Sequence, residues 1–419
     1  MHRIIAAVLA AGVCTSSLQA QTSPPVAAGP AFTLADALVR AGASSAAQEA
    51  AIANIRAAEA QRRVAGLRPN PSIDVQTENV AGTGLYQGLR SSETTAGLSL
   101  PLELGGKRNA RVAVANAQLD RAGLDAEVAR ADLRLRVTRS YIEAAAAQRR
   151  LEVARDQARI AIEALRGARV RVASGRASPL EEQRADVARI TAEGAAERAE
   201  RTAAVTSANL GLLTGGLVGT LDLAWFDRTD RIGPDRPVAL GSTLAAVAAH
   251  ADVSVAEARV RLARSQRVPD VTVSAGARRL EQTNDVAAVF GVSIPLNIFN
   301  GGRAAMDVSS AQRDQADALR RMALLDAEQS IASAHTEAAN AATTARNASG
   351  PALAAATEAA RIARIGYREG KFGQLDLLDA ERTLSETRAN AIDALATYHE
   401  AQARLDRLTM SADTMEDDQ

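Results

Sequence analysis

The chain carries Leu98-Ser99-Leu100-Pro101-Leu102 with Gly105-Gly106-Lys107 close behind, and it repeats this pattern as Val292-Ser293-Ile294-Pro295-Leu296 with Gly301-Gly302-Arg303. Two further pairs of stretches keep the same register: Pro71-Ser72-Ile73-Asp74-Val75 with Pro269-Asp270-Val271-Thr272-Val273, and Gly175-Arg176-Ala177-Ser178-Pro179-Leu180-Glu181 with Gly370-Lys371-Phe372-Gly373-Gln374-Leu375-Asp376. A repeat of this length indicates a duplicated domain rather than a solenoid unit. Each copy is expected to fold as a helix, two strands and a long helical hairpin.

Alternation of apolar residues with polar or small ones predicts one β-hairpin in each copy. The first hairpin is expected over about 72–104 and the second over about 270–298, each with one apolar face. Pro101 and Pro295 are each expected to close a second strand at the strand-to-helix junction. Proline is tolerated there because it cannot donate a hydrogen bond to the ladder.

Apolar and small residues at alternating spacings of four and three predict coiled-coil seams in two long helical hairpins. The first hairpin is expected over about 107–213 with its tip near 175, and the second over about 303–408 with its tip near 370. The first seam comprises Leu133, Val137, Ser140, Ala144, Ala147, Leu151, Ala154, Ala158, Ala161, Leu165, Ala168 and Val172. The seam of the last helix comprises Leu384, Thr387, Ala391, Ala394, Tyr398, Ala401, Leu405 and Leu408. The first long helix alone would extend roughly 100 Å. A compact domain does not need a helix of that length, so the helix indicates an elongated, rod-shaped molecule.

These elements divide the chain into two repeats and a connection. Residues 33–213 form the first repeat, which opens with a helix from 33 to 65, and residues 243–409 form the second. A Gly/Pro-rich linker over 214–242 joins the two repeats, and 410–419 form an acidic tail.

The N-terminus indicates export. Residues 1–20 combine a charged start, a short apolar run and a small residue at the cut, which is typical of a cleaved signal peptide, and residues 21–32 form a tether. Cys14 is the one cysteine: it is either discarded with the signal or serves as a lipoprotein anchor. In both cases the exported chain has no thiol pair for a disulfide.

Composition argues against several classes of function. Lys plus Arg and Asp plus Glu both number 49, so the chain lacks the basic footprint of a nucleic-acid-binding protein. The four histidines are isolated, without the spacing of metal ligands, and Gly105-Gly106-Lys107 lacks the spacing of a phosphate-binding loop. We therefore expect neither an enzyme nor a cofactor or metal centre.

One chain has too few strands to close a barrel by itself, which predicts an assembly of several chains. Two hairpins supply four strands, whose free edges would find no water in a membrane. Two chains would close an eight-stranded barrel with a filled interior, and three would close a twelve-stranded barrel with a lumen. We therefore predict a mainly α fold with a small β part: a homotrimer whose barrel sits among membrane lipids and continues as an α-helical tube. An exported coiled-coil scaffold or adhesion protein without a lumen is the alternative.

The duplicated plan, the strand-end prolines and the tip motifs resemble the TolC-type outer-membrane efflux proteins over the whole mature chain. Pro101-Leu102-Glu103-Leu104-Gly105-Gly106-Lys107-Arg108 and Ser178-Pro179-Leu180-Glu181-Glu182 look most like the cobalt–zinc–cadmium branch. The resemblance implies a passive exit duct in the outer membrane of a Gram-negative bacterium, with a large periplasmic portion. It also implies two partners, a periplasmic adaptor protein and an inner-membrane RND pump. Heavy-metal cations are the expected cargo, and organic drugs or type I secretion are the alternatives.

The resemblance also implies roles for residues at the two helical tips. Gly175, Ser178, Gly370 and Phe372 would contact the adaptor, although any helical hairpin needs a glycine of this kind. Asp376 and Asp379 match carboxylates that ring the entrance, and Tyr367 matches a tyrosine of the closed gate. Asp376 could instead be a charge that favours the start of its helix. This chain departs from the pattern at Phe372, where the best-known member has an arginine, and in the first copy, where Glu181 and Arg184 replace the aspartate pair.

Overall fold

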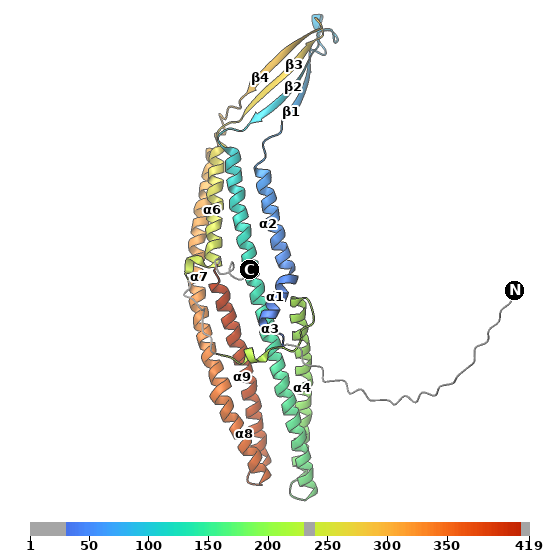
Figure 1. Cartoon of the computed structure of the whole chain (residues 1–419), viewed down its shortest axis with the longest axis vertical. Helices are drawn as coiled ribbons and strands as arrows, with labels where there is room; N and C mark the ends of the chain where they lie inside the picture. The colour runs from blue at the N-terminus through green and yellow to red at the C-terminus, as the bar shows by residue number, and fades with distance from the viewer. Residues whose placement is uncertain (1–30, 230–238, 412–419) are drawn as a thin grey trace, which may run out of the picture.

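The computed structural model describes residues 31–229 and 239–411. The molecule is a long rod with a β-sheet at one end and two helical tips at the other (Figure 1). The expected signal peptide, Cys14, nearly all of the tether and residues 412–419 of the tail lie outside the described residues. The expectation of a mainly helical fold with a small antiparallel sheet is confirmed.

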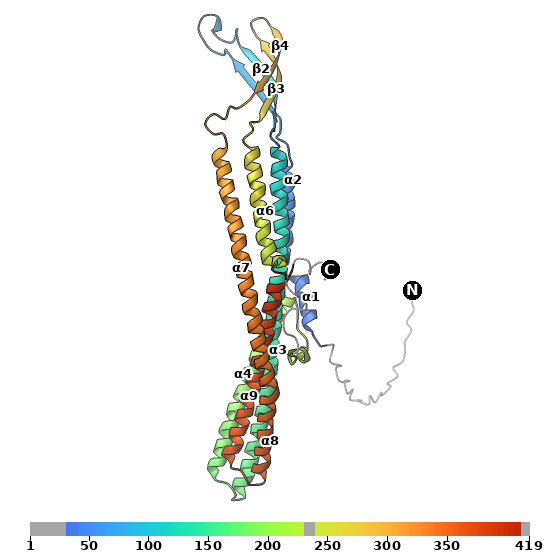
Figure 2. The same ribbon diagram turned by 90° about the vertical axis from the view of Figure 1, so that its left-hand side faces the viewer.

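The four strands form one antiparallel sheet in chain order. They are β1 (Ser72–Glu78), β2 (Glu93–Leu102), β3 (Val271–Leu280) and β4 (Asp285–Ser293), and a short 3-10 turn, η1 (Gly84–Tyr86), lies in the β1–β2 loop. Strand β2 of the first repeat pairs with β3 of the second, so the sheet joins the two copies. The β1–β2 and β3–β4 loops lie at the end of the sheet farthest from the helices (Figures 1 and 2).

The two faces of the sheet differ in chemistry because side chains alternate along each strand. One face exposes large apolar side chains: Ile73, Val75, Leu98, Leu100, Val286, Phe290 and Val292. The other face, here called the inner face, carries polar, charged and small residues that pair across the strands, such as Ser99 with Ser274 and Thr95 with Arg278.

The two strand-end prolines are not equivalent. Pro101 lies inside β2, one residue before its end, and is paired in register with Thr272. Pro295 lies two residues beyond the last residue of β4, Ser293, in the connection that leads to α7, which is the strand-to-helix junction where it was expected. A proline without an N–H group cannot extend the hydrogen-bonded ladder of β4.

Four helices lie below the sheet, side by side in the order α2 (Ala46–Ala65), α3 (Lys107–Ala173), α6 (Leu244–Ser265) and α7 (Arg303–Asn347); Figure 1 separates α2 from α3, and Figure 2 separates α6 from α7. The helix expected from 33 to 65 is two helices, α1 (Leu34–Ser44) and α2, so this prediction was wrong in its continuity. Ser45 separates them with extended backbone and accepts a hydrogen bond from the Gln48 N–H at 3.4 Å. A serine in this conformation caps a new helix rather than continuing the old one.

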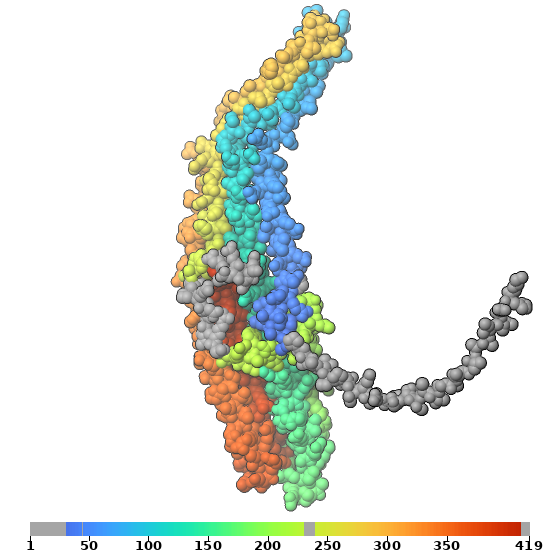
Figure 3. Space-filling model, viewed as in Figure 1, coloured from blue at the N-terminus to red at the C-terminus, as the bar shows by residue number. Residues whose placement is uncertain are grey.

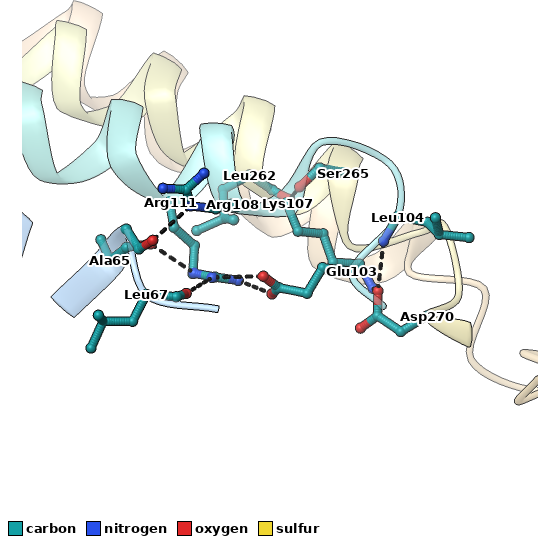
Figure 4. Close-up of polar contacts among 11 residues, drawn as sticks. Ala65, Leu67, Glu103, Leu104, Lys107, Arg108, Arg111, Leu262, Ser265 and Asp270 are labelled. Atoms are coloured by element: carbon teal, nitrogen blue, oxygen red, sulfur yellow. Dashed lines mark hydrogen bonds and ion pairs between the residues drawn. The ribbon is translucent and has the colours of Figure 1, made fainter. Parts of the chain in front are cut away.

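A polar network fixes the helices to the sheet (Figure 4). Arg111 of α3 forms a bidentate ion pair with Glu103, which follows β2, and donates to the carbonyl oxygen of Leu67 at 3.1 Å. Lys107 pairs with Asp270 at 2.7 Å, and Asp270 also accepts from the Leu104 N–H at 3.1 Å. The network therefore joins the end of α2, the β2–α3 connection and the α6–β3 connection.

Two helical hairpins run from the middle of the rod to the tips. The first is α3 with α4 (Pro179–Thr214), and the second is the rod α7–η3–α8 with α9 (Gln374–Thr409), where α8 is Leu353–Arg368. Every residue of both predicted seams is buried or half-buried. Helix α3 is uninterrupted, whereas η3 (Ala348–Ala352) is a π-helical turn that contains Pro351. Proline lacks the N–H group of a regular helical hydrogen bond, so the second rod is interrupted there.

The largest buried side chains gather at the middle of the rod. The short helix α5 (Leu223–Phe226) places Trp225 against His399 with ring centroids 4.2 Å apart, and His399 Nε2 lies 2.9 Å from the carbonyl oxygen of Phe226. Tyr141 donates to the carbonyl oxygen of Phe32 at 2.9 Å.

Two isolated β-bridges and a second 3-10 turn lie in the same middle region of the rod. Phe32 pairs with Leu221 in parallel, and Thr243 pairs with Ser411 in antiparallel fashion. The turn η2 (Leu240–Ser242) leads into α6. Across the described residues, no helix is both long enough and apolar enough to span a membrane.

Candidate functional site at the helical tips

The two helical hairpins reverse direction with the same backbone geometry. Gly175 and Gly370 have φ angles of 69° and 75°, a left-handed conformation that glycine adopts without a steric penalty. After each glycine, the next N–H group reaches back to a carbonyl oxygen of the preceding helix, from Arg176 to Arg171 and from Lys371 to Gly366, both at 2.8 Å. Arg171 and Gly366 therefore occupy matching positions in the two repeats.

The outgoing helices are capped in different ways. Ser178 caps α4 by accepting from the Leu180 N–H at 3.3 Å, with Pro179 as the first helical residue. At the matching position α9 has Gly373, which has no side chain to act as a cap. Asp376, the third residue of α9, makes a different contact there: its carboxylate accepts from the Gly373 N–H at 2.9 Å. Asp376 was expected either to line the entrance or to favour the start of its helix. Its contact with Gly373 places the carboxylate at the start of α9.

Glu181, the counterpart of Asp376 in α4, connects the two hairpins instead of capping its own helix. Its carboxylate accepts a hydrogen bond from the hydroxyl of Tyr367 in α8, and its backbone carbonyl accepts from Gln374 Nε2 at 2.9 Å. Arg171 of α3 forms an ion pair with Glu181 at 3.5 Å, and its guanidinium lies 4.6 Å from the centre of the Tyr367 ring. We call Arg171, Glu181, Tyr367 and Gln374 the tip bridge.

The tip bridge leaves Tyr367 protonated at neutral pH. Burial, followed by the hydrogen bond to Glu181, raises the pKa of Tyr367 to about 12. A neutral phenol can donate to a carboxylate, whereas a phenolate could only accept. Hydrogen bonds to a charged group are stronger than neutral ones, so the bridge adds a polar connection at the tips between two hairpins that already pack together through α3 and α9 (Figure 3).

The remaining predicted tip residues lie outside this bridge. Asp379 is exposed on α9 and pairs with Arg382 at 2.8 Å, a neighbour three residues later on the same helix. Phe372 folds back over α8: a Cβ atom added to Gly366 would lie only 2.1 Å from Cδ2 of the Phe372 ring. Gly366 therefore makes room for an aromatic side chain at the tip.

Three members of the tip bridge and the role of Gly366 were not predicted. Glu181 and Arg184 were noted only as departures from the aspartate pattern, and Arg171, Gln374 and Gly366 were not singled out. Arg171 and Gly366 could have been found by aligning the two tips, since a repeat places them at the same position. The link from Glu181 to Tyr367 could not, because the two residues lie in different hairpins.

In the described ranges 31–229 and 239–411, no group of three or more His, Cys, Asp or Glu residues is placed to hold a metal ion. The tip residues described above interact through charge, hydrogen bonds and packing.

Comparison with known proteins assigns the chain to a family. The model of the family described as "Outer membrane efflux protein" matches residues 37–216 and 238–409. The cobalt-zinc-cadmium resistance protein CzcC of Cupriavidus metallidurans is 31% identical over 92% of this chain and 91% of its own length. The nickel and cobalt resistance protein CnrC of the same bacterium is 32% identical over 68% of this chain and 69% of its own.

The fold is also that of a solved outer-membrane protein. VceC from Vibrio cholerae superposes with a TM-score of 0.73 at 21% identity, covering 90% of this chain and 96% of that one. Long helical hairpins beneath a small antiparallel sheet are thus a fold that this chain shares with a solved outer-membrane protein. The chain belongs to the outer membrane efflux protein family, as its resemblance to TolC-type proteins implied. It is an outer-membrane protein with a large periplasmic portion.

Proposed function

We propose that this protein forms a homotrimeric exit duct for heavy-metal cations. In this assembly three four-stranded sheets close one twelve-stranded barrel, and the long helices continue it as a tube through the periplasm. The sheet is the observation that carries the proposal: it exposes an apolar face, and among the described residues the outer edges of β1 and β4 have no partner strand. Unpaired backbone groups are costly in hydrocarbon, so these edges need strands from other copies.

The duct would be the passive outer component of a tripartite RND-type system, together with a periplasmic adaptor and an inner-membrane pump. Its cargo would move from the periplasm to the exterior. The names of CzcC and CnrC, which refer to resistance to cobalt, zinc, cadmium and nickel, support heavy-metal cations as the cargo. A duct needs water and charge rather than tight binding sites, which fits a chain without a metal centre in its described part.

The helical tips would form the periplasmic entrance of this duct. Three copies would bring six carboxylates, from Asp376 and Asp379, to a narrow ring that favours cations. The hydrogen bond between Tyr367 and Glu181 supports a role in the closed gate, because it holds one hairpin of each copy against the other. The outermost residues of both tips would contact the adaptor: Gly175, Ser178, Gly370 and Phe372.

Three measurements test this proposal. The mature protein, purified in detergent, should have the mass of a trimer and should produce single-channel conductance in planar bilayers. A stable monomer that leaves bilayers silent would overturn the duct, and recovery from the soluble periplasm would favour the scaffold alternative. A deletion strain should become sensitive to cobalt, zinc, cadmium, copper or nickel. Sensitivity to antibiotics alone would change the cargo to organic drugs.

A further inference from the structure

A like-charged pair of residues lies at the loop end of the inner face of the sheet. Glu78 of β1 and Glu93 of β2 are directly opposite each other in the antiparallel register. Like charges at such positions destabilise a strand pair unless something neutralises them. Both carboxylates are only partly exposed, at 42% and 27% of their side chains, so water screens them incompletely.

Arg278 of β3 neutralises this pair. Its Nη1 donates to Glu93 at 2.9 Å, its Nη2 lies 3.5 Å from Glu78, and its Nε donates to the Thr95 hydroxyl at 3.0 Å. One guanidinium therefore spans three strands and both repeats. The fork geometry of arginine, with several donors in one plane, makes this possible where a point charge could not contact all three groups.

Arg278 is also the only cation on the inner face of the four strands. The acidic residues at the other inner-face positions are Asp74, Glu78, Glu93 and Asp285, as the strand register shows. The neighbouring Arg279 points to the opposite face, where it pairs with Glu281 and Asn284, both at 3.1 Å. The two adjacent arginines thus place equal charges on opposite sides of one strand.

We infer that Arg278 is a specificity-determining residue of the duct: a tethered counter-ion that prevents Glu78 and Glu93 from retaining divalent cations at the exit. The inference rests on the proposed duct, in which the inner face lines the lumen and the loop end opens to the exterior. Facing carboxylates offer oxygen ligands and negative charge, both of which attract divalent cations, and Asp and Glu oxygens serve as ligands of zinc in proteins. A site on a conduction path must bind weakly enough to release its ion. The guanidinium occupies the place that such a cation would take.

The test is asymmetric block of the trimer in planar bilayers, with cobalt or zinc chloride added on the side of the sheet loops. Arg278→Gln should lower the half-blocking concentration about tenfold, because the divalent cation then meets two uncompensated carboxylates at close range. Block from the other side, at the helical tips, should change much less. Arg278→Lys should restore the wild-type value only in part, since the positive charge returns but a single ammonium group cannot contact both carboxylates and Thr95 at once.

Two further variants separate this role from a structural one. Arg279→Gln removes the same charge from the opposite face and should leave the block unchanged. The triple variant with Arg278→Gln, Glu78→Gln and Glu93→Gln should return to weak block, because the attracting carboxylates are gone. If Arg278→Gln yields no trimer, Glu78→Gln with Glu93→Gln in the otherwise unchanged chain should lower the preference for cations over anions, since Arg278 is then unpaired.

The outcomes that overturn the inference differ from those that overturn the duct. Conducting trimers whose block is the same in wild type and Arg278→Gln would remove the role of Arg278 and leave the duct intact. An unchanged ion preference in the double glutamine variant would do the same. A wild-type protein that never conducts would remove the duct, and the inference with it.

Discussion

Tyr367 in α8 donates a hydrogen bond to the carboxylate of Glu181 in α4, and this contact ties the two helical hairpins together at their tips. The hairpins belong to different repeats, so the contact joins the two halves of the duplicated chain at the end opposite to the sheet. Gln374 reinforces it from α9 by donating to the backbone carbonyl of Glu181 at 2.9 Å.

Removing the Tyr367 hydroxyl should loosen the tips. Hydrogen bonds to charged groups contribute about 1.5–3 kcal/mol, so Tyr367→Phe should raise the ratio of open to closed channels by roughly tenfold or more. Single-channel recording in planar bilayers measures this ratio. Tyr86→Phe, in the exposed loop between β1 and β2, is the matched control and should behave as wild type. Equal open times in both variants would show that the tip bridge does not hold the entrance closed.

The carboxylates of α9 give a separate prediction for the entrance. Replacing Asp376 and Asp379 together by asparagine should weaken block by multivalent cations added from the tip side, because a ring of six negative charges disappears. Asp314→Asn, at an exposed position of α7 paired with Arg313, is the control for the loss of one surface carboxylate outside the tips. Unaltered block in the double variant would remove the entrance ring while leaving the duct in place.

Gly366 should be intolerant of even one additional methyl group. A Cβ atom there would overlap the Phe372 ring, so Gly366→Ala should destabilise the tip by about 1–3 kcal/mol. Thermal unfolding should show the loss, and adding Phe372→Ala should largely restore stability because the obstructing ring is gone. Gly167→Ala in α3 is the control: nothing lies within 4 Å of its added Cβ, and alanine favours a helix. Similar losses in both glycine variants would contradict the packing argument.

The network at the base of the sheet should contribute to stability. Arg111→Met removes the ion pair to Glu103 and the hydrogen bond to Leu67, and leaves a carboxylate with an exposed side-chain fraction of only 13% without its main partner. We expect a loss of about 1–3 kcal/mol, measured by the temperature at which trimers dissociate. Arg201→Met is the control, because its ion pair with Glu197 spans 3.8 Å between exposed side chains and should contribute little.

His399 should make the middle of the rod sensitive to acid. Burial lowers the pKa of His399, so the unfolded chain binds a proton more readily than the folded one. The free energy of unfolding is therefore highest above the pKa of an unfolded histidine, about 6.5. It falls as the pH drops through that value toward the lower pKa of His399 in the folded chain. Thermal unfolding followed from about pH 7.5 to about pH 5.5 should show this decline, and His399→Gln should reduce its slope. His335→Gln, on an exposed part of α7, should retain the wild-type slope.

Much of the architecture was predictable because it depends on periodic patterns. The strands and helices follow from spacings of two and of three to four residues, and both predicted seams lie at buried or half-buried positions. The interruption at Pro351 was predictable in principle from Gly350-Pro351 but was not recognised. The break at Ser45 is harder to foresee, because a serine is neutral inside a helix and decisive only when its backbone becomes extended.

The sequence by itself determined the duplication, the two-faced hairpins, the glycine reversals at the tips and, through resemblance, the efflux family. Each of these depends on residues close together in the chain or on a pattern repeated along it. Only the tertiary structure decided which charged groups meet: Glu181 with Tyr367, Arg278 with Glu78 and Glu93, and Arg111 with Glu103. Arginine and carboxylate side chains are so frequent in this chain that composition leaves many pairings open. Strand register and helix packing select among them, because an ion pair forms only between groups brought within a few ångström.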